Sequence, residues 1–413
     1  MLTLNVCSIF GTCIKQGVVL ELENRRVILM TPGPTEVSFR VLKAMLQPAF
    51  EPHDERFLKA FDGTLEMLAK IHQTEDYIIL LPGTGRTGME ASAASLFMPG
   101  DKVLSVVSGF FGELWVKMME RIGIKIVRIN FPWGKSLDID VVKKAIKKNK
   151  GIKALTIPHC ETSTGVVHPI RELGEIASNE DVLFLVDAVS TIGGIEMRMD
   201  NWHVDVCVSA SQKCLGALLG LSIVALSKKS LETMEKREAP PTSFVYDLLR
   251  WKQKGWFQHQ KPSPRSFPIY SNPNLVFTLN AACKIILKEG LKKRYERHRI
   301  ARDAMIEGLD SIGLKLFPSR DVASNTVTVV KTKDGMSEKI KETMLRKHNI
   351  LIQSSIIPDL IGKILRIGHL GLTASERYIL PTISSLEQTL NALNLNVKIG
   401  TGVKAARDIF DQN

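Results

Sequence analysis

Two stretches of the chain indicate its fold most clearly, VLFLVDAVS at residues 182–190 and VCVSASQK at residues 206–213. Each begins with a short apolar run rich in β-branched residues, which is typical of a strand buried on both faces of a parallel sheet. Asp187 follows the first run and Lys213 the second. An ionisable group at the edge of an apolar sheet needs a partner or takes part in chemistry. The two residues mark a candidate site, with solvated loop residues or helix N-caps as the ordinary alternative.

Outward from these stretches, strand and helix patterns alternate. Strands are predicted at residues 77–81, 102–107, 125–129, 153–157 and 221–226, and helices at residues 87–98, 113–122, 138–148 and 169–178. Repeated βα units predict an α/β fold whose sheet is mostly parallel, with helices on both faces. Ligands of such sheets bind outside the carboxyl ends of the strands. The residues at these ends are Gly83, Gly109, His159, Asp187 and Lys213.

The remaining segments predict a second, smaller domain. Residues 237–273 are rich in proline, aromatic and basic residues and predict an irregular crossover. Helices over about residues 274–309 and a β-α-β-α pattern over residues 326–393 favour a small α+β domain. We therefore expect a large domain with an N-terminal arm at residues 30–275, a small C-terminal domain at residues 276–400 and a tail at residues 401–413. Residues 1–29 lack a basic leader and a clear cleavage site, so we expect translation to begin at Met30 and residues 1–29 to be a non-native or disordered extension.

Composition excludes several classes of protein. The 413 residues carry a formal net charge of +12, but the basic residues are scattered in short helical groups and do not cluster as a nucleic-acid site requires. No apolar run approaches the roughly 20 residues that span a bilayer. Six cysteines without a CxxC pair favour neither a disulfide framework nor a zinc site and fit a reducing cytoplasm. We expect no nucleic-acid partner, no membrane association and no metal.

Several motifs after the predicted strands suggest how a ligand is held. LPGTGRTG at residues 81–88 joins a strand to a helix, where glycines and free N–H groups could cradle a phosphate. It lacks the ending of a P-loop and the spacing of a dinucleotide fingerprint, and a tight turn without a ligand is the alternative. SGFFG at residues 108–112 places aromatic side chains at a strand end, where one could stack on a planar ring or pack in the core.

Two further motifs carry polar groups to the same edge. PHCETSTG at residues 158–165 offers hydroxyl groups that could bind a phenolic oxygen, whereas His159 alone is more often structural. Arg366 lies within the apolar strand ILRIG at residues 364–368, where it could clamp a substrate carboxylate or form an internal salt bridge. A lysine in a dry pocket is a nucleophile for Schiff-base chemistry, and a buried aspartate can hold the protonated ring nitrogen of pyridoxal phosphate. Together the motifs favour a pyridoxal phosphate enzyme.

At this point the chain resembles the class V aminotransferases, which are fold type I pyridoxal phosphate enzymes, and within them the serine–pyruvate and alanine–glyoxylate aminotransferases. The resemblance covers about residues 30–395. It rests on TPGPT at residues 31–35, ETSTG at 161–165, VDAVS at 186–190 with Gly193-Gly194, SQK at 211–213 and LRIG at 365–368. Fold type I implies a large domain with a seven-stranded, mostly parallel sheet and a smaller C-terminal α+β domain.

The resemblance also implies roles for individual residues. Lys213 forms the Schiff base, Asp187 pairs with the ring nitrogen, and Phe111 stacks on the ring where animal members have tryptophan. Arg366 binds the substrate α-carboxylate. Homodimers of this family complete the phosphate site from the neighbouring subunit, here through residues 263–268, where Ser263 or Ser266 replaces the tyrosine of animal members. The other residues assigned to the cofactor are Thr84, Gly85, Arg86 and Gln212 around the phosphate and Thr162 near the phenolic oxygen.

The implied activity is transamination between a small L-amino acid, serine or alanine, and a small 2-oxo acid, pyruvate or glyoxylate. Small substrates are favoured because no second arginine for a substrate side chain is evident. Aspartate and 2-aminoethylphosphonate stay open as alternative donors. A cysteine desulfurase would need a nucleophilic cysteine on a loop after the lysine, and none is found. A cofactor-binding or nucleic-acid-binding protein without catalysis is the alternative of a different class, and the full set of catalytic residues argues against it.

Overall fold

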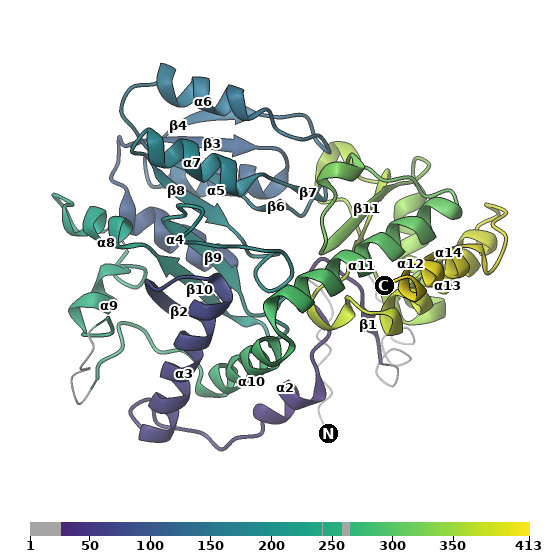
Figure 1. Ribbon diagram of the computed structural model, residues 1–413, viewed down its shortest axis with the longest axis horizontal. Helices are drawn as coiled ribbons and strands as arrows, with labels where there is room; N and C mark the ends of the chain where they lie inside the picture. The colour runs from purple at the N-terminus through teal and green to yellow at the C-terminus, as the bar shows by residue number, and fades with distance from the viewer. Residues whose placement is uncertain (1–25, 242, 258–264) are drawn as a thin grey trace, which may run out of the picture.

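The computed structural model describes residues 26–241, 243–257 and 265–413 (Figure 1). The large domain is built on a seven-stranded sheet with strand order β2-β10-β9-β8-β5-β3-β4. Only β10 runs antiparallel to its neighbours, so the predicted mostly parallel sheet is confirmed. Its strands are β2 (Tyr77–Gly83), β3 (Lys102–Val107), β4 (Lys125–Asn130), β5 (Ile152–Pro158), β8 (Leu183–Asp187), β9 (Val206–Ala210) and β10 (Gly220–Leu226).

Helices between the strands cover this sheet. Helix α4 is unusually close to it, because a Cβ atom at Gly88 would lie 2.8 Å from Val208 on β9 and 2.6 Å from Ser222 on β10. The close approach draws the amino end of α4 to the carboxyl edge of the sheet. The helices of this domain are α2 (Phe39–Ala44), α3 (Glu55–His72), α4 (Gly85–Leu96), α5 (Phe110–Arg121), α6 (Ile139–Lys148), α7 (Ile170–Asn179), α8 (Lys228–Glu235), α9 (Leu249–Gln253) and α10 (Pro273–Glu289), and β6 (Cys160–Glu161) pairs with β7 (Val166–Val167).

The smaller domain has its own sheet and core. Strands β11 (Val327–Lys331), β14 (Ile364–Gly368) and β13 (Gln353–Ser354) form an antiparallel sheet in that order. Beside it, β1 (Ile28–Leu29) pairs in parallel with β12 (Ile350–Leu351). The helices are α11 (Leu291–Ser311), α12 (Met336–His348), α13 (Glu376–Ala392) and α14 (Thr401–Asp411), with 3-10 turns at Arg320–Val322, Pro358–Leu360 and Gly371–Thr373.

The boundary between the two hydrophobic cores differs from the expected residue 276. Helix α10 contributes Val276, Leu279 and Ile286 to the large-domain core, whereas α11 contributes Ala301 and Leu309 to the small-domain core. The change of core therefore falls at Gly290, between the two helices. The sequence pattern could not separate them because only one residue, Gly290, divides the two helices.

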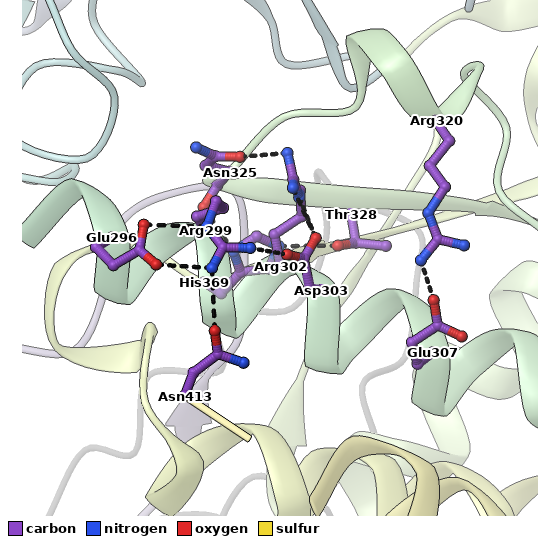
Figure 2. A network of polar contacts seen from close by, with 10 residues as sticks. All are labelled: Glu296, Arg299, Arg302, Asp303, Glu307, Arg320, Asn325, Thr328, His369 and Asn413. Carbon is purple, nitrogen blue, oxygen red and sulfur yellow. Dashed lines mark hydrogen bonds and ion pairs between the residues drawn. The ribbon is translucent and has the colours of Figure 1, made fainter. Parts of the chain in front are cut away.

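Both ends of the described chain also differ from the prediction. Residues 401–411, expected as a tail, form α14, which packs on α11 and buries Ala406 (Figure 1). Arg299 on α11 donates to the Asn413 side chain at 3.2 Å, within a polar network that also joins Arg302 to Asn325 at 2.7 Å (Figure 2). At the other end, β1 precedes Met30 and belongs to the small-domain sheet region, whereas residues 1–25 of the expected extension lie outside the described residues.

Within the described ranges, no helix is both long enough and apolar enough to cross a lipid bilayer.

Candidate active site

A cavity of about 420 Å³ lies where the carboxyl edge of the large sheet meets the small domain. The cavity is lined from the sheet edge by β8, the residues after β9 and the amino ends of α4 and α5, and from the small domain by β13 and β14. The residues that the sequence predicted for cofactor or substrate all line this cavity except Ser266 and Ser263, and Ser263 lies outside the described residues. These lining residues are Thr84, Gly85, Arg86, Phe111, Thr162, Asp187, Gln212, Lys213 and Arg366.

Lys213 stands in the turn after β9 and is held against the N-terminal segment. Its Nζ donates to the carbonyl of Pro32, and a Cβ atom at Gly33 would overlap the lysine side chain. Gly33 also has φ +124°, a conformation that favours glycine. Burial lowers the pKa of the Lys213 amine to about 8. The TPGPT segment therefore forms one wall of a dry pocket in which the amine is partly neutral near neutral pH.

Asp187 ends β8 in the middle of the sheet. The residue is 7% exposed, and its Oδ1 accepts a hydrogen bond from the Val189 N–H at 2.9 Å. Burial raises the pKa of its carboxyl to about 7, with the negative charge of Glu161 acting in the same direction. A buried carboxylate of raised pKa gains most from a cationic partner in the cavity. The position thus suits a group that binds a protonated ring nitrogen.

The amino end of α4 and Gln212 form another wall of the cavity. Thr84 precedes the helix, and its N–H donates to Thr87 Oγ1 at 3.1 Å. The N–H groups of Gly85 and Arg86 fall in the first turn, which leaves backbone donors without intrahelical acceptors. Gln212 is 6% exposed, and its buried Oε1 has no hydrogen-bond partner among the described residues. Free donors, the helix dipole and a guanidinium fit a phosphate group here.

Phe111 and Thr162, to which the resemblance assigns contacts with a planar ring, both line the cavity. Phe111 lines the cavity in the first turn of α5, and its ring lies edge-on to that of Phe110, with centroids 5.3 Å apart. Thr162 follows β6, and its Oγ1 lies 2.9 Å from Ser190 Oγ. The hydroxyl pair faces the cavity, because both residues line it. An aromatic surface from the first turn of α5 and hydroxyl groups from the turns after β6 and β8 therefore line the same cavity.

Arg366 faces the cavity from the small domain. The side chain is 5% exposed, and its Nε donates to the carbonyl of Ser354 at 2.8 Å. Among the described residues, neither Nη atom has a hydrogen-bond partner and no carboxylate forms a salt bridge with Arg366. Burial lowers the pKa of the guanidinium to about 10, so it stays charged at neutral pH. The two free donors favour the carboxylate clamp over the internal salt bridge.

The structure also identifies lining residues that sequence reasoning missed. Gln353 on β13 lies opposite Arg366 in the sheet register, and Ile356 follows in the next loop. Strand β13, which carries Gln353, has two residues and is too short to show the period-two pattern by which a strand is recognised in a sequence. Glu161, to which no role was assigned, is fully buried behind Phe111.

Other sequence candidates lie outside the cavity. His159 is buried, and its backbone N–H donates to the Asp187 carbonyl at 2.8 Å, which is a structural contact. Ser266 is exposed, and its carbonyl accepts a hydrogen bond from the Trp256 indole at 3.1 Å. Ser263 lies outside the described residues. The thiol of Cys214, next to Lys213, is buried, which raises its pKa to about 12 and makes it a poor nucleophile.

The family model of aminotransferase class V matches residues 27–355. An uncharacterized aminotransferase of Methanocaldococcus jannaschii is 34% identical, over 95% of this chain and 99% of that protein. The (S)-ureidoglycine–glyoxylate transaminase of Bacillus subtilis is 33% identical, over 93% of this chain and 95% of that protein. These matches extend across both domains.

Solved structures agree with the sequence matches. The crystal structure of the Bacillus subtilis ureidoglycine–glyoxylate aminotransferase has a TM-score of 0.86 and covers 94% of this chain and 99% of its own. That of the pyridoxamine–pyruvate aminotransferase of Mesorhizobium loti has a TM-score of 0.88 at 27% identity and covers 94% of this chain and 98% of its own. With the amino end of α4, a partly buried lysine and a buried aspartate around one cavity, the chain belongs to the class V aminotransferases, which use pyridoxal phosphate.

Proposed function

We propose that the protein transfers the amino group of a small L-amino acid, alanine or serine, to a small 2-oxo acid, glyoxylate or pyruvate. The observation that carries this proposal is the buried guanidinium of Arg366, which faces Lys213 across a cavity of about 420 Å³. Relatives named alanine–glyoxylate aminotransferase, from Drosophila melanogaster, and serine–glyoxylate aminotransferase, from Methylorubrum extorquens, support these substrates.

Binding and proton transfer are carried out by different residues of the chain. Pyridoxal phosphate supplies an electron-accepting ring and an aldehyde carbon that combines with amines. Arg366 fixes the carboxylate of the amino acid, and Phe111 and Asp187 hold the ring by stacking and by pairing with its nitrogen. The Lys213 amine takes the proton from the substrate Cα and later returns it. A lowered pKa suits this task, because the base must be neutral near the working pH.

The alternative donors are aspartate and 2-aminoethylphosphonate. Arg86 also lines the cavity, and its exposed position at the start of α4 supports this alternative if the guanidinium binds an acidic substrate side chain. Arg86→Met separates the two cases. If Arg86 serves the cofactor, the variant binds pyridoxal phosphate more weakly. If it serves the substrate, KM rises for aspartate and not for alanine.

We further propose that two copies of the chain form a homodimer that completes each phosphate site. Residues 263–268 are the segment expected to reach the partner, and Ser266 is exposed and away from the cavity of its own chain. Exposed apolar side chains at α2 also support the homodimer, because Phe39 is 78% and Leu46 81% exposed and a second copy of the chain would cover them. Sedimentation of the holoenzyme would test this, and a monomer that keeps full cofactor affinity would contradict it.

The test of the proposed reaction is Lys213→Ala with a screen of amino donors. We expect the variant to lose the visible absorption band of the bound cofactor. Turnover should fall by at least about 10²–10⁴-fold, the range contributed by a positioned acid–base group. In the native enzyme, alanine and serine should bleach this band and release 2-oxo acid. An unchanged spectrum and rate in the variant would refute the assignment.

A further inference from the structure

A buried carboxylate behind the candidate site has no role in the reaction described so far. Glu161 is 0% exposed and directly precedes Thr162. Its Oε2 accepts hydrogen bonds from the N–H groups of Phe111 and Gly112, each at 3.0 Å. Its Oε1 accepts from the N–H of Ser163 at 3.1 Å and from the Ser163 hydroxyl at 2.5 Å. The carboxylate thus joins two separate walls of the cavity.

The contact with α5 supplies the side-chain N-cap that the sequence at the start of that helix lacks. Gly109 is the N-cap residue of α5 and has no side chain with which to bind the free N–H groups. A Cβ atom at Gly109 would lie 2.5 Å from Glu161 Cγ, so the glycine leaves the room that the carboxylate occupies. An anion at a helix amino end is also favoured by the helix dipole. Glu161 therefore caps, from another strand, the turn that carries Phe111.

The negative charge of Glu161 also affects the pKa values of two other groups that line the cavity. Burial raises the pKa of Asp187, and the charge of Glu161 adds to that rise. Burial lowers the pKa of Arg366, and the charge of Glu161 offsets part of that fall. Burial raises the pKa of Glu161 itself, while the hydrogen bonds from Ser163, Gly112 and Phe111 lower it. Its effect on the site is therefore both geometric and electrostatic.

We propose that Glu161 is a positioning residue that holds Phe111 against the cofactor ring by capping α5 from the loop that carries Thr162. This inference deepens the proposed function and rests on it, because the ring contact of Phe111 is part of that function. Glu161 itself touches neither substrate nor cofactor in this arrangement. It acts through the helix turn that it caps.

Glu161→Gln tests the proposal with an isosteric, uncharged group. Whichever way the amide points, its NH₂ faces at least one backbone N–H and leaves it unpaired, because of the four donors only the Ser163 hydroxyl can turn to accept. We expect the dissociation constant for pyridoxal phosphate, measured by titrating the apoenzyme, to rise roughly 10- to 100-fold. The visible circular dichroism of the bound cofactor should change as well, because the ring loses its fixed neighbour.

The matched control is Glu387→Gln in the small domain. Glu387 is also 0% exposed, and it accepts the N–H groups of Gly400 at 2.8 Å and Gly402 at 2.6 Å at the start of α14. The control loses the same kind of buried cap far from the cavity, so it should lower stability and leave cofactor affinity and dichroism unchanged. Equal losses of cofactor affinity in both variants would overturn the proposal, as would wild-type affinity in Glu161→Gln.

A double variant shows whether Glu161 acts through Phe111. Glu161→Gln combined with Phe111→Leu should bind the cofactor about as weakly as the weaker single variant, and losses that multiply would overturn the proposal. Should Glu161→Gln fail to fold, Glu161→Asp replaces it, with a smaller loss and the same non-additivity expected. Failure of the native protein to develop a visible band with pyridoxal phosphate would instead sink the proposed function itself.

Discussion

Replacement of Arg366 gives the sharpest test of how the substrate is bound. The two Nη atoms are free to donate two parallel hydrogen bonds to a carboxylate, each worth about 1.5–3 kcal/mol when charged. Arg366→Lys keeps a charge and loses one of them, so kcat/KM for alanine should fall roughly 10- to 150-fold. Arg366→Met loses both, about 3–6 kcal/mol, and should cost roughly 10²- to 10⁴-fold.

The assay compares alanine with ethylamine, which lacks the carboxylate. If Arg366 binds that carboxylate, ethylamine should react at nearly the same low rate in the native enzyme and in both variants. Arg302→Lys, which alters a partly buried arginine of the small domain bonded to Asn325, should leave the ratio of the two substrates unchanged. Equal losses for alanine and ethylamine in the Arg366 variants would refute the reasoning, because they would show a structural role instead.

Two further predictions concern stability. Three fully buried histidines have pKa values lowered by burial to about 4, namely His72, His168 and His369. Between pH 6.5 and 4 their unfolded forms bind protons that the folded forms do not, so each lowers the free energy of unfolding by up to about 1.4 kcal/mol per pH unit. The raised pKa values of Asp187 and Glu161 oppose part of this loss, and the lowered pKa values of the buried His159 and His298 add to it. The urea midpoint of the apoprotein should therefore fall between pH 7.5 and 5.5; an unchanged midpoint would contradict this. Gly402→Leu should destabilise the protein by about 1–3 kcal/mol, because its Cβ would lie 2.8 Å from the Gly308 carbonyl where α14 crosses α11. The exposed replacement Arg407→Leu is its control, and equal melting temperatures for the two variants would show that the crossing is not tight.

Much of the large domain was predictable because most strands of its sheet, though not β4, are buried on both faces. Strand 102–107 was predicted with its observed bounds, and β2 and β5 extend the predicted ranges by one or two residues. Helix α5 begins at Phe110, three residues before the predicted start at Glu113. Its first turn depends on Glu161, which is distant in the sequence, and no local pattern reports such a cap.

The candidate site likewise has features that local sequence patterns predicted and features that only long-range packing determined. The sequence by itself determined the chemical groups, because glycines, Lys213 and Asp187 at strand ends leave a local signature of apolar runs that stop at a polar residue. Only the tertiary structure decided which distant segments face them. It placed Gly33 against Lys213 and left both Nη atoms of Arg366 without a hydrogen-bond partner in the part of the chain that the structure describes. Such contacts depend on how the small domain and the N-terminal segment pack on the sheet edge, and packing between segments far apart in the sequence leaves no periodic signal within either one.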